Sequence, residues 1–144
     1  MSKIKEKSAG IVPIKLEDGE YLFLLLRSYN FWDFPKGRIE PYESALSAAI
    51  RETYEETTIP DQQLLFVWGT DSYTTEPYKK GIKTGTYFVA KTTATTIDLP
   101  YSEEIGKPEH EEFRWVTYEE GKKLTNKRIG GVLEWAYKKI TESG

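Results

Sequence analysis

The N-terminal third of the chain shows the apolar pattern of two β-strands. Residues 7–15 predict a first strand, and Pro13 within it favours a sheet edge or a bulge, because proline has no backbone N–H. Residues 17–20 read EDGE, which is a turn signal. The near-continuous apolar run YLFLLLR at residues 21–27 predicts a second strand that is buried on both faces.

Helical spacing is clearest over residues 43–57. Pro60 ends this predicted helix, because the residue before a proline avoids helical backbone angles. A second helix is predicted over residues 128–140. Apolar positions at spacings of three and four mark one face of each helix: Ala45, Leu46, Ala49 and Ile50, continued by Thr53, in the first, and Ile129, Val132, Leu133, Ala136 and Ile140 in the second.

The remaining elements are strands at residues 64–73, 84–91 and 112–116. Between them we expect an irregular aromatic stretch at 29–38, a polar mobile loop at 75–85 and a long connection at 92–110. A connection that long in a compact domain usually lines a site or is disordered. The order of strands and helices predicts an α/β or α+β fold, with a mixed sheet between helices, formed by one domain that spans residues 1–144.

Composition narrows the classes of protein. A hydrophobic content of 38% is typical of a globular chain, and the absence of cysteine excludes disulfides, thiolate metal sites and cysteine nucleophiles. The polar start MSKIKEKSAG and the lack of any long apolar run argue against a signal peptide or membrane partner, so we expect a cytoplasmic protein. A net charge of −3 disfavours coating of long nucleic acid but leaves contact with a nucleotide or an RNA end open.

Three glutamates project from one side of the first predicted helix. Glu52 is spaced three residues from Glu55 and four from Glu56. Like charges at these spacings weaken a helix by roughly a few tenths of a kcal/mol per pair, and a hard divalent cation held by carboxylate oxygens would offset that repulsion. The ordinary alternative is a solvated acidic helix face, and on either reading we expect this face to lie open to solvent.

The surrounding segment, GRIEPYESALSAAIRETYEETTI at residues 37–59, resembles the signature of the Nudix hydrolase family. Six positions match in identity and spacing: Gly37, Glu43, Arg51, Glu52, Glu55 and Glu56. Two positions depart from the pattern, since Thr53 replaces an aliphatic residue and Thr58 replaces the glycine that closes the helix. A β-branched residue is poor in the left-handed conformation, so we expect a different helix exit here, set by Pro60.

The resemblance implies a fold, a reaction and roles for these residues. The family has an α/β/α sandwich and hydrolyses phosphoanhydride bonds by in-line attack of water, with Mg²⁺ as cofactor and Mn²⁺ as a substitute. Glu52, Glu55 and Glu56, together with the Gly37 carbonyl, are the implied metal ligands. The implied base is a helix glutamate, Glu55 or Glu56, or one from a distant loop. Glu43 and Arg51 are the implied structural pair.

Further stretches resemble one branch of the family. These are SAGIV at residues 8–12, WDFPKGR at 32–38 and PEHEEFRWV at 108–116. The branch contains asymmetrical diadenosine tetraphosphate (Ap4A) hydrolases, RNA 5′-pyrophosphohydrolases and diphosphoinositol polyphosphate hydrolases. Glu109, six residues before Trp115, is the implied second-loop ligand or base; the alternative is a solvated glutamate. Lys36 in the Pro-Lys-Gly sequence favours Ap4A hydrolysis to ATP and AMP. RNA or nucleoside triphosphate hydrolysis and a catalytically silent binding domain are the alternatives.

The candidate substrate-binding residues are cationic or aromatic. Arg27, Lys36 and Lys80 are candidates for phosphate, and Tyr73 and Tyr78 for stacking on a nucleobase. The related enzymes carry an aromatic residue just before the last helix, where this chain has Lys127 and Arg128, which indicates a more highly charged substrate. His110 is either a phosphate contact or an incidental loop residue. The sequence leaves a monomer and a homodimer equally open.

Overall fold

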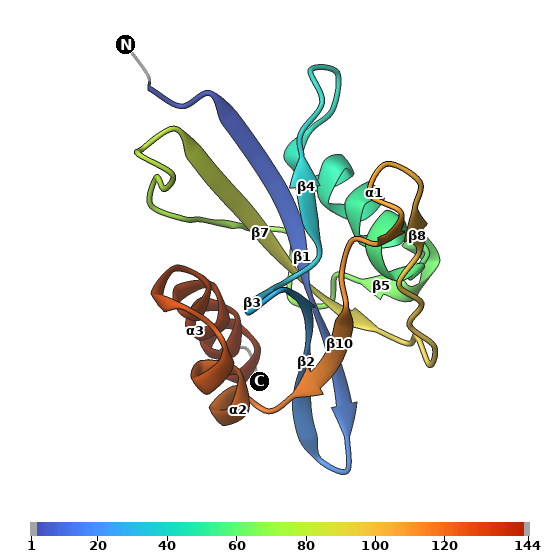
Figure 1. The fold of residues 1–144 in the computed structure, drawn as a ribbon. Helices are drawn as coiled ribbons and strands as arrows, with labels where there is room; N and C mark the ends of the chain where they lie inside the picture. The colour runs from blue at the N-terminus through green and yellow to red at the C-terminus, as the bar shows by residue number, and fades with distance from the viewer. Residues whose placement is uncertain (1–2, 143–144) are drawn as a thin grey trace.

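The computed structural model describes residues 3–142 and places a mixed sheet between helices (Figure 1). The main path of the sheet is β10-β2-β1-β7-β5, in which β1 and β7 are parallel and the other pairs antiparallel. The strands along this path are β1 (Glu6–Glu17), β2 (Glu20–Ser28), β5 (Leu64–Leu65), β7 (Lys83–Thr92) and β10 (Glu112–Val116). Three short strands pair beside it: β3 (Phe31–Asp33) with β2, β4 (Lys36–Arg38) with β1, and β6 (Tyr73–Thr74) with β7.

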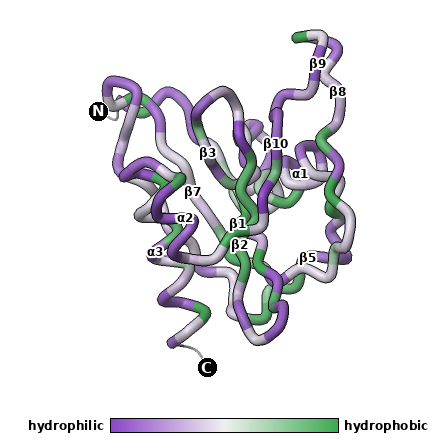
Figure 2. Tube along the Cα trace, turned by 60° about the horizontal axis from the view of Figure 1, so that its bottom comes forward, coloured by the Kyte–Doolittle hydropathy of each residue, from purple (hydrophilic) through white to green (hydrophobic). Residues whose placement is uncertain are grey.

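Two apolar cores lie on opposite faces of the sheet, as the predicted sandwich requires. α1 (Ala45–Thr57) covers one face, and α2 (Tyr118–Leu124) and α3 (Lys127–Glu142) cover the other (Figure 1). β2 contributes to both cores, because Phe23 and Leu25 face α3 while Leu24 and Leu26 face α1. The prediction of a strand buried on both faces is therefore confirmed. Figure 2 shows the apolar residues gathered along the central strands and the polar ones on the connections.

Pro13 does not lie at a sheet edge, so the first of its two predicted settings, an edge or a bulge, was wrong. β1 is an interior strand that pairs along one side with β7, and along the other first with β4 and then with β2. The backbone N–H of Ile11 donates to Pro35 O, and alternate residues of a strand address the same neighbour. The missing N–H of Pro13 therefore falls between the last β4 partner and the first β2 partner, where the sheet loses no hydrogen bond.

Several predicted connections are more ordered than the sequence indicated. The aromatic stretch at 29–38 contains β3 and β4, and the connection at 92–110 contains a small hairpin of β8 (Tyr101–Ser102) and β9 (Lys107–Pro108). The predicted strand at 64–73 is wrong, because only β5 and the first residue of β6 are extended, after the 3-10 turn η1 (Asp61–Gln63). α2 was missed, although Thr117 and Glu120 form a capping box that marks its start.

The exit of α1 also differs from the expectation. The helix begins at Ala45, two residues later than predicted, and the hydroxyl of Ser44 caps its start. At the other end Thr58 adopts the left-handed conformation, with φ 66° and ψ 10°, and its N–H donates to Tyr54 O. The helix therefore ends as it would with glycine, and Thr58 carries a strain of about 1–2 kcal/mol. Pro60 lies two residues beyond this turn and does not set it.

The final helix agrees with its prediction, since the five apolar residues of its predicted face are all buried against the sheet. None of the helices within residues 3–142 combines the length and the apolar composition that a membrane crossing requires.

Candidate active site

The backbone of β4 and the last two turns of α1 lie in direct contact. Gly37 is packed so closely on Glu52 that a Cβ at this position would lie 2.0 Å from the Glu52 Cδ. The Lys36 N–H donates to the Glu56 carboxylate at 3.1 Å. Only glycine permits the first approach, and the second holds one glutamate against the strand. These contacts bring the backbone of β4 at Gly37 together with Glu52 and Glu56, two of the predicted ligands.

Arg51 ties the loop before α1 to the helix itself. Its guanidinium donates to both oxygens of Glu43 at 2.7 and 2.8 Å, and to Arg38 O at 3.0 Å. It also donates to Glu52 at 2.8 Å and to Glu55 at 3.1 Å. The hydrogen bonds from Arg51 lower the pKa of the Glu43 carboxyl to about 2. The two parallel hydrogen bonds from Arg51 to Glu43 fix the loop before α1 against the helix, so the pair acts as a structural clamp.

The acidic face of α1 is not open to solvent throughout, which corrects the sequence-based expectation. The side chain of Glu55 is 51% exposed and that of Glu52 only 15%, whereas Glu56 as a whole residue is 8% exposed. Burial, together with the charges of Glu109 and Glu52, raises the pKa of Glu56 well above its ordinary value. Burial, opposed by Arg51 and assisted by the charges of Glu55 and Glu109, raises that of Glu52.

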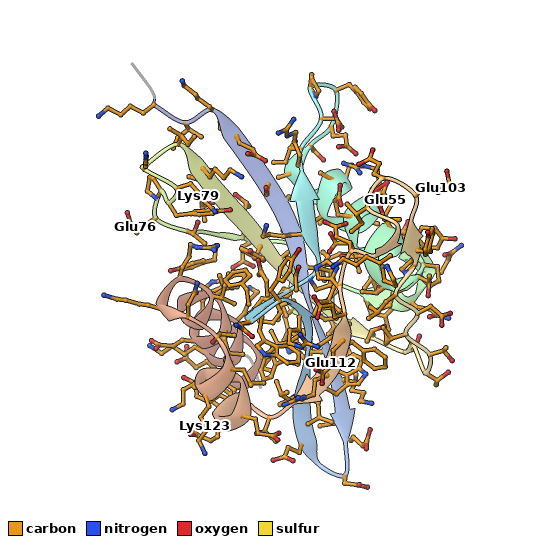
Figure 3. The ribbon with its side chains drawn as sticks, viewed as in Figure 1. Glu55, Glu76, Lys79, Glu103, Glu112 and Lys123 are labelled. Carbon is orange, nitrogen blue, oxygen red and sulfur yellow. The ribbon has the colours of Figure 1, made fainter. Side chains whose placement is uncertain are left out.

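Glu109 comes from the connection before β10 and meets α1 across two adjoining cavities. One cavity of about 200 Å³ is lined by Glu55, Glu56, Glu109 and His110, together with the β8 hairpin. The second, of about 180 Å³, is again lined by Glu56, Glu109 and His110. Figure 3 shows Glu55 on α1 beside the loop that carries Glu103. The long connection therefore lines the site, as its length predicted.

These carboxylates fit a hard divalent cation by chemistry. Within residues 3–142 no three acidic or histidine side chains are already grouped so as to hold a metal ion, and Arg51 engages Glu52 and Glu55. The donors are nevertheless oxygens of the kind that such cations take. The charge of Glu109 also raises the pKa of both Glu52 and Glu56, and a bound cation relieves such repulsion between like charges.

Lys36 is the predicted phosphate residue that the structure brings to the site. Its side chain lines the second cavity beside Glu56, and its Nζ lies 3.7 Å from the Asp33 carboxylate. Asp33 is buried and also accepts hydrogen bonds from Phe34 N and the Tyr87 hydroxyl. Burial raises the pKa of Asp33 despite these partners. The Asp33 carboxylate therefore holds the Lys36 ammonium group in a fixed position at the wall of the second cavity.

Arg27 and Lys80 are not brought to these cavities. Arg27 is paired with Glu111 and Glu112, each at 2.9 Å, and donates to Tyr29 O, so its guanidinium joins β2 to β10. Lys80 is exposed at the turn before β7, where its φ is 60°. Nothing in their surroundings distinguishes either residue as a phosphate contact.

The two candidate tyrosines line a separate groove of about 810 Å³ between the loop after β6, α2 and the start of α3. Tyr73 packs on Trp135, with ring centroids 5.7 Å apart, and its hydroxyl approaches Gly131. Tyr78 is covered on one face by the guanidinium of Arg128, whose Cζ lies 3.7 Å from the ring centroid. A cation thus occupies a face of Tyr78 that the prediction assigned to a nucleobase.

Three residues near the site carried weaker signals in the sequence. His110 lines both cavities, and burial lowers the pKa of its imidazole. Asp33 was passed over, although its place between Trp32 and Phe34 is a signal of a buried carboxylate. Arg128 was noted only as the replacement of an aromatic residue.

Comparison with known proteins agrees with this geometry. The family model of the NUDIX domain matches residues 5–136, which include α1, β4 and the connection that carries Glu109. The chain belongs to the Nudix family.

Relatives in that family cover most of the chain. The asymmetrical bis(5′-nucleosyl)-tetraphosphatase of Caenorhabditis elegans is 34% identical over 126 residues, which are 83% of this chain and 85% of that protein. The mouse protein of the same name is 31% identical over 113 residues, 76% of this chain and 74% of its own length. A crystal structure of a C. elegans Ap4A hydrolase binary complex superposes with a TM-score of 0.78 at 28% identity, covering 96% and 97% of the two chains.

This Nudix protein is accordingly a pyrophosphohydrolase with the α/β/α architecture of its structural relatives. Nudix hydrolases act on small nucleotide substrates and generally need divalent metal ions. The carboxylates on α1 and on the connection before β10 have the chemistry that such ions require. Roles for individual residues follow as proposals.

Proposed function

We propose that this Nudix hydrolase cleaves dinucleoside polyphosphates asymmetrically, with Ap4A giving ATP and AMP. One observation carries the proposal: the buried Glu56 lies across two adjoining cavities from Glu109 and His110, directly beside Lys36. Relatives named asymmetrical bis(5′-nucleosyl)-tetraphosphatase, at 31–34% identity, supply the choice of substrate. The proposal treats residues 1–144 as one Nudix domain in a cytoplasmic protein, monomeric or homodimeric.

Magnesium is the proposed cofactor, with manganese as a substitute. The proposed ligands are oxygen donors that lie where α1 meets β4 and the connection before β10. They are Glu52, Glu55 and Glu56 on α1, the Gly37 carbonyl and Glu109. When bound, the ion neutralises phosphate oxygens and makes the phosphorus easier to attack.

The remaining chemistry belongs to side chains of this chain. A water oxygen forms a bond to one phosphorus of the tetraphosphate, and the anhydride P–O bond opposite it breaks, so that a nucleotide leaves with that oxygen. The proton of the water passes to a carboxylate. Glu56 and Glu109 are the first candidates, since they flank the same cavities, and Glu55 is the third. Lys36 and His110 are placed to contact phosphate oxygens.

Product analysis tests the substrate. The protein is incubated with Mg²⁺ and equal amounts of Ap4A, ATP, dGTP and 5′-triphosphorylated RNA. ATP and AMP should appear fastest, from Ap4A, and Glu56→Gln should form them at least about 100-fold more slowly. Equal product from the Glu56→Gln variant would overturn the assignment of this site.

A second candidate function is hydrolysis of RNA 5′ ends. A relative named RNA pyrophosphohydrolase from Shewanella pealeana is 31% identical over 113 residues, 69% of this chain. Pyrophosphate released mainly from RNA in the same panel would establish it. No product from any substrate would favour a catalytically silent binding domain or a diphosphoinositol phosphate substrate.

A further inference from the structure

The groove between the loop after β6, α2 and α3 contains an arginine that lacks the polar partners of the others. The guanidinium of Arg128 lies on the ring of Tyr78 at 3.7 Å and near that of Phe31 at 5.6 Å. Among residues 3–142 its buried Nη1 has no hydrogen-bond partner. Arg27 and Arg51, in contrast, donate to carboxylates at 3.2 Å or less.

A buried arginine nitrogen without an acceptor destabilises the folded protein. A buried donor without an acceptor costs about 1–3 kcal/mol, and stacking on a ring orients the guanidinium without using its N–H groups. The arrangement therefore keeps a planar cation beside the groove with the N–H donors of its Nη1 unused. An incoming acceptor, with a small shift of Tyr78 or Arg128, gains the bonds that the protein does not supply.

The charges around Arg128 favour an anion as that acceptor. The charges of Lys36 and Arg128 both act on the buried Asp33 carboxylate and lower its pKa against the effect of burial. Within the groove itself, Lys122 and Lys127 add to Arg128, whereas the acidic residues along its wall are Glu76 and Glu134.

A continuous wall connects this cation to the carboxylate site. Glu56, Lys36 and Phe31 line the same cavity of about 180 Å³, and Phe31 in turn faces the guanidinium of Arg128. A chain of phosphates that starts at Glu56 would pass Lys36 first and reach Arg128 next. A nucleobase at Arg128 is disfavoured, because the guanidinium already covers a face of Tyr78.

We propose that Arg128 is a specificity-determining residue that binds a phosphate group of the substrate remote from the bond that is cleaved. The inference rests on the proposed function for the identity of the substrate, and it predicts a preference for long polyphosphate chains. Arg128 acts on binding and not on the chemical step, since it lines the groove and not the cavities that contain Glu109.

Binding of inorganic tripolyphosphate in EDTA, measured by calorimetry, tests the proposal without requiring turnover. Arg128→Met should weaken binding about 10- to 100-fold, as the loss of a charge-assisted hydrogen bond predicts. Arg128→Lys should bind with intermediate affinity, since it keeps the charge without the planar fork. Arg114→Met is the matched control, because Arg114 also lies over an aromatic ring, Trp32, but is paired with Glu112.

Kinetics supply the second arm, with Ap3A, Ap4A and Ap5A as substrates. Arg128→Met should raise KM, most for the longer chains, while kcat changes less than about threefold. Equal tripolyphosphate affinity in wild type and Arg128→Met, or no binding by wild type, would overturn the inference, as would a fall in kcat with KM unchanged. If wild type hydrolyses none of these substrates, the proposed function fails, and the tripolyphosphate arm still decides the role of Arg128.

Discussion

The two faces of the sheet present opposite chemistry to a substrate. On the α1 face, acidic side chains are packed against backbone and accept hydrogen bonds from Arg51 and from the Lys36 N–H. On the α3 face, tyrosines and cations line a groove in which the buried Nη1 of Arg128 has no hydrogen-bond partner among residues 3–142. Lys36 lies between the two, beside Glu56 and in contact with the buried Asp33.

On our proposals, this difference separates the residues that carry out hydrolysis, on the α1 face, from those that select the substrate, on the α3 face. Hydrolysis requires carboxylates at fixed positions, so the α1 face is built from short hydrogen bonds and close backbone contacts such as that of Gly37 with Glu52. Selection requires groups that bind only when the substrate arrives, so the α3 face keeps an unpaired donor. Variants on each face, and at Lys36 between them, should therefore fail in different ways.

The largest effect is expected for Glu56→Gln on the α1 face. Turnover should fall by about 10²–10⁴-fold, the contribution of a positioned general base, or further if a ligand is lost too. Without metal ions the variant should melt at a higher temperature than wild type. The pKa of Glu56 is raised in the folded state, so this residue opposes folding increasingly as pH rises above its ordinary value of 4.5.

Activity assays and thermal melts at pH 7, with EDTA and with Mg²⁺, check both halves of this prediction. Mg²⁺ should stabilise wild type more than Glu56→Gln. Glu119→Gln, which changes an exposed glutamate of α2, is the control and should change neither quantity. A lower melting temperature of Glu56→Gln in EDTA would contradict the account of this buried carboxylate.

Lys36→Met should act on both faces, through loss of a phosphate contact and loss of the partner of Asp33. Breaking a buried ion pair leaves an uncompensated charge, so we expect unfolding to become easier by about 3 kcal/mol, the lower end of the usual range because Lys36 is partly exposed. Denaturant titration measures the change. The double variant Asp33→Asn with Lys36→Met should regain part of the loss, and strict additivity of the two substitutions would exclude coupling.

Glu43→Gln should weaken the clamp on the α1 face without touching the groove. The pKa of Glu43 is lowered to about 2 in the folded protein, so its contribution to stability is present above pH 4.5 and disappears as pH falls towards 2. Melting temperatures of wild type and variant, measured from pH 7 to pH 2, should differ most at neutral pH and converge on acidification. A difference that stays constant across this range would show that the ion pair with Arg51 is not responsible.

The smallest effect is expected for Thr58→Gly at the end of α1. Glycine removes the strain of the left-handed conformation, so the protein should gain about 0.5–1 kcal/mol in denaturant titration. Thr125→Gly is the matched control, because Thr125 ends α2 at an ordinary φ of −95° and should lose stability on the same substitution. A loss at both positions would mean that the left-handed threonine is not strained.

Elements with strong local patterns were predictable from the sequence, and elements that depend on partners were not. α1, α3, β1, β2 and β7 contain long runs with helical or strand spacing, and all were placed within a few residues. β3 and β4 have three residues each, and they are strands only because β2 and β1 lie beside them. The interior position of Pro13 was unpredictable for the same reason, since it depends on where two other strands meet β1.

The glutamates of α1 could be found from the sequence because their spacing, with Gly37 and Arg51, matches a family signature. Their environments could not be found this way. Helical spacing places Glu52 and Glu56 on one side of α1, but only the packing of β4 against that side buries Glu56 and leaves Glu55 exposed. Burial depends on neighbours from elsewhere in the chain, and it determines which carboxylate has a perturbed pKa.

The sequence by itself determined the family, the hydrolytic chemistry and the set of acidic residues, because these depend on residue type and short-range spacing. The tertiary structure alone decided that Arg27 is paired with Glu111 and Glu112. It alone decided that Arg128 covers Tyr78 with an Nη1 that finds no hydrogen-bond partner in the described part of the chain. Whether a cation is available to a substrate depends on which acceptors lie within about 3 Å of it. Glu111, which pairs with Arg27, lies 84 positions from it in the chain, and the ring of Tyr78, which covers Arg128, is also distant in sequence. A local sequence pattern contains no information on which of these distant residues meet.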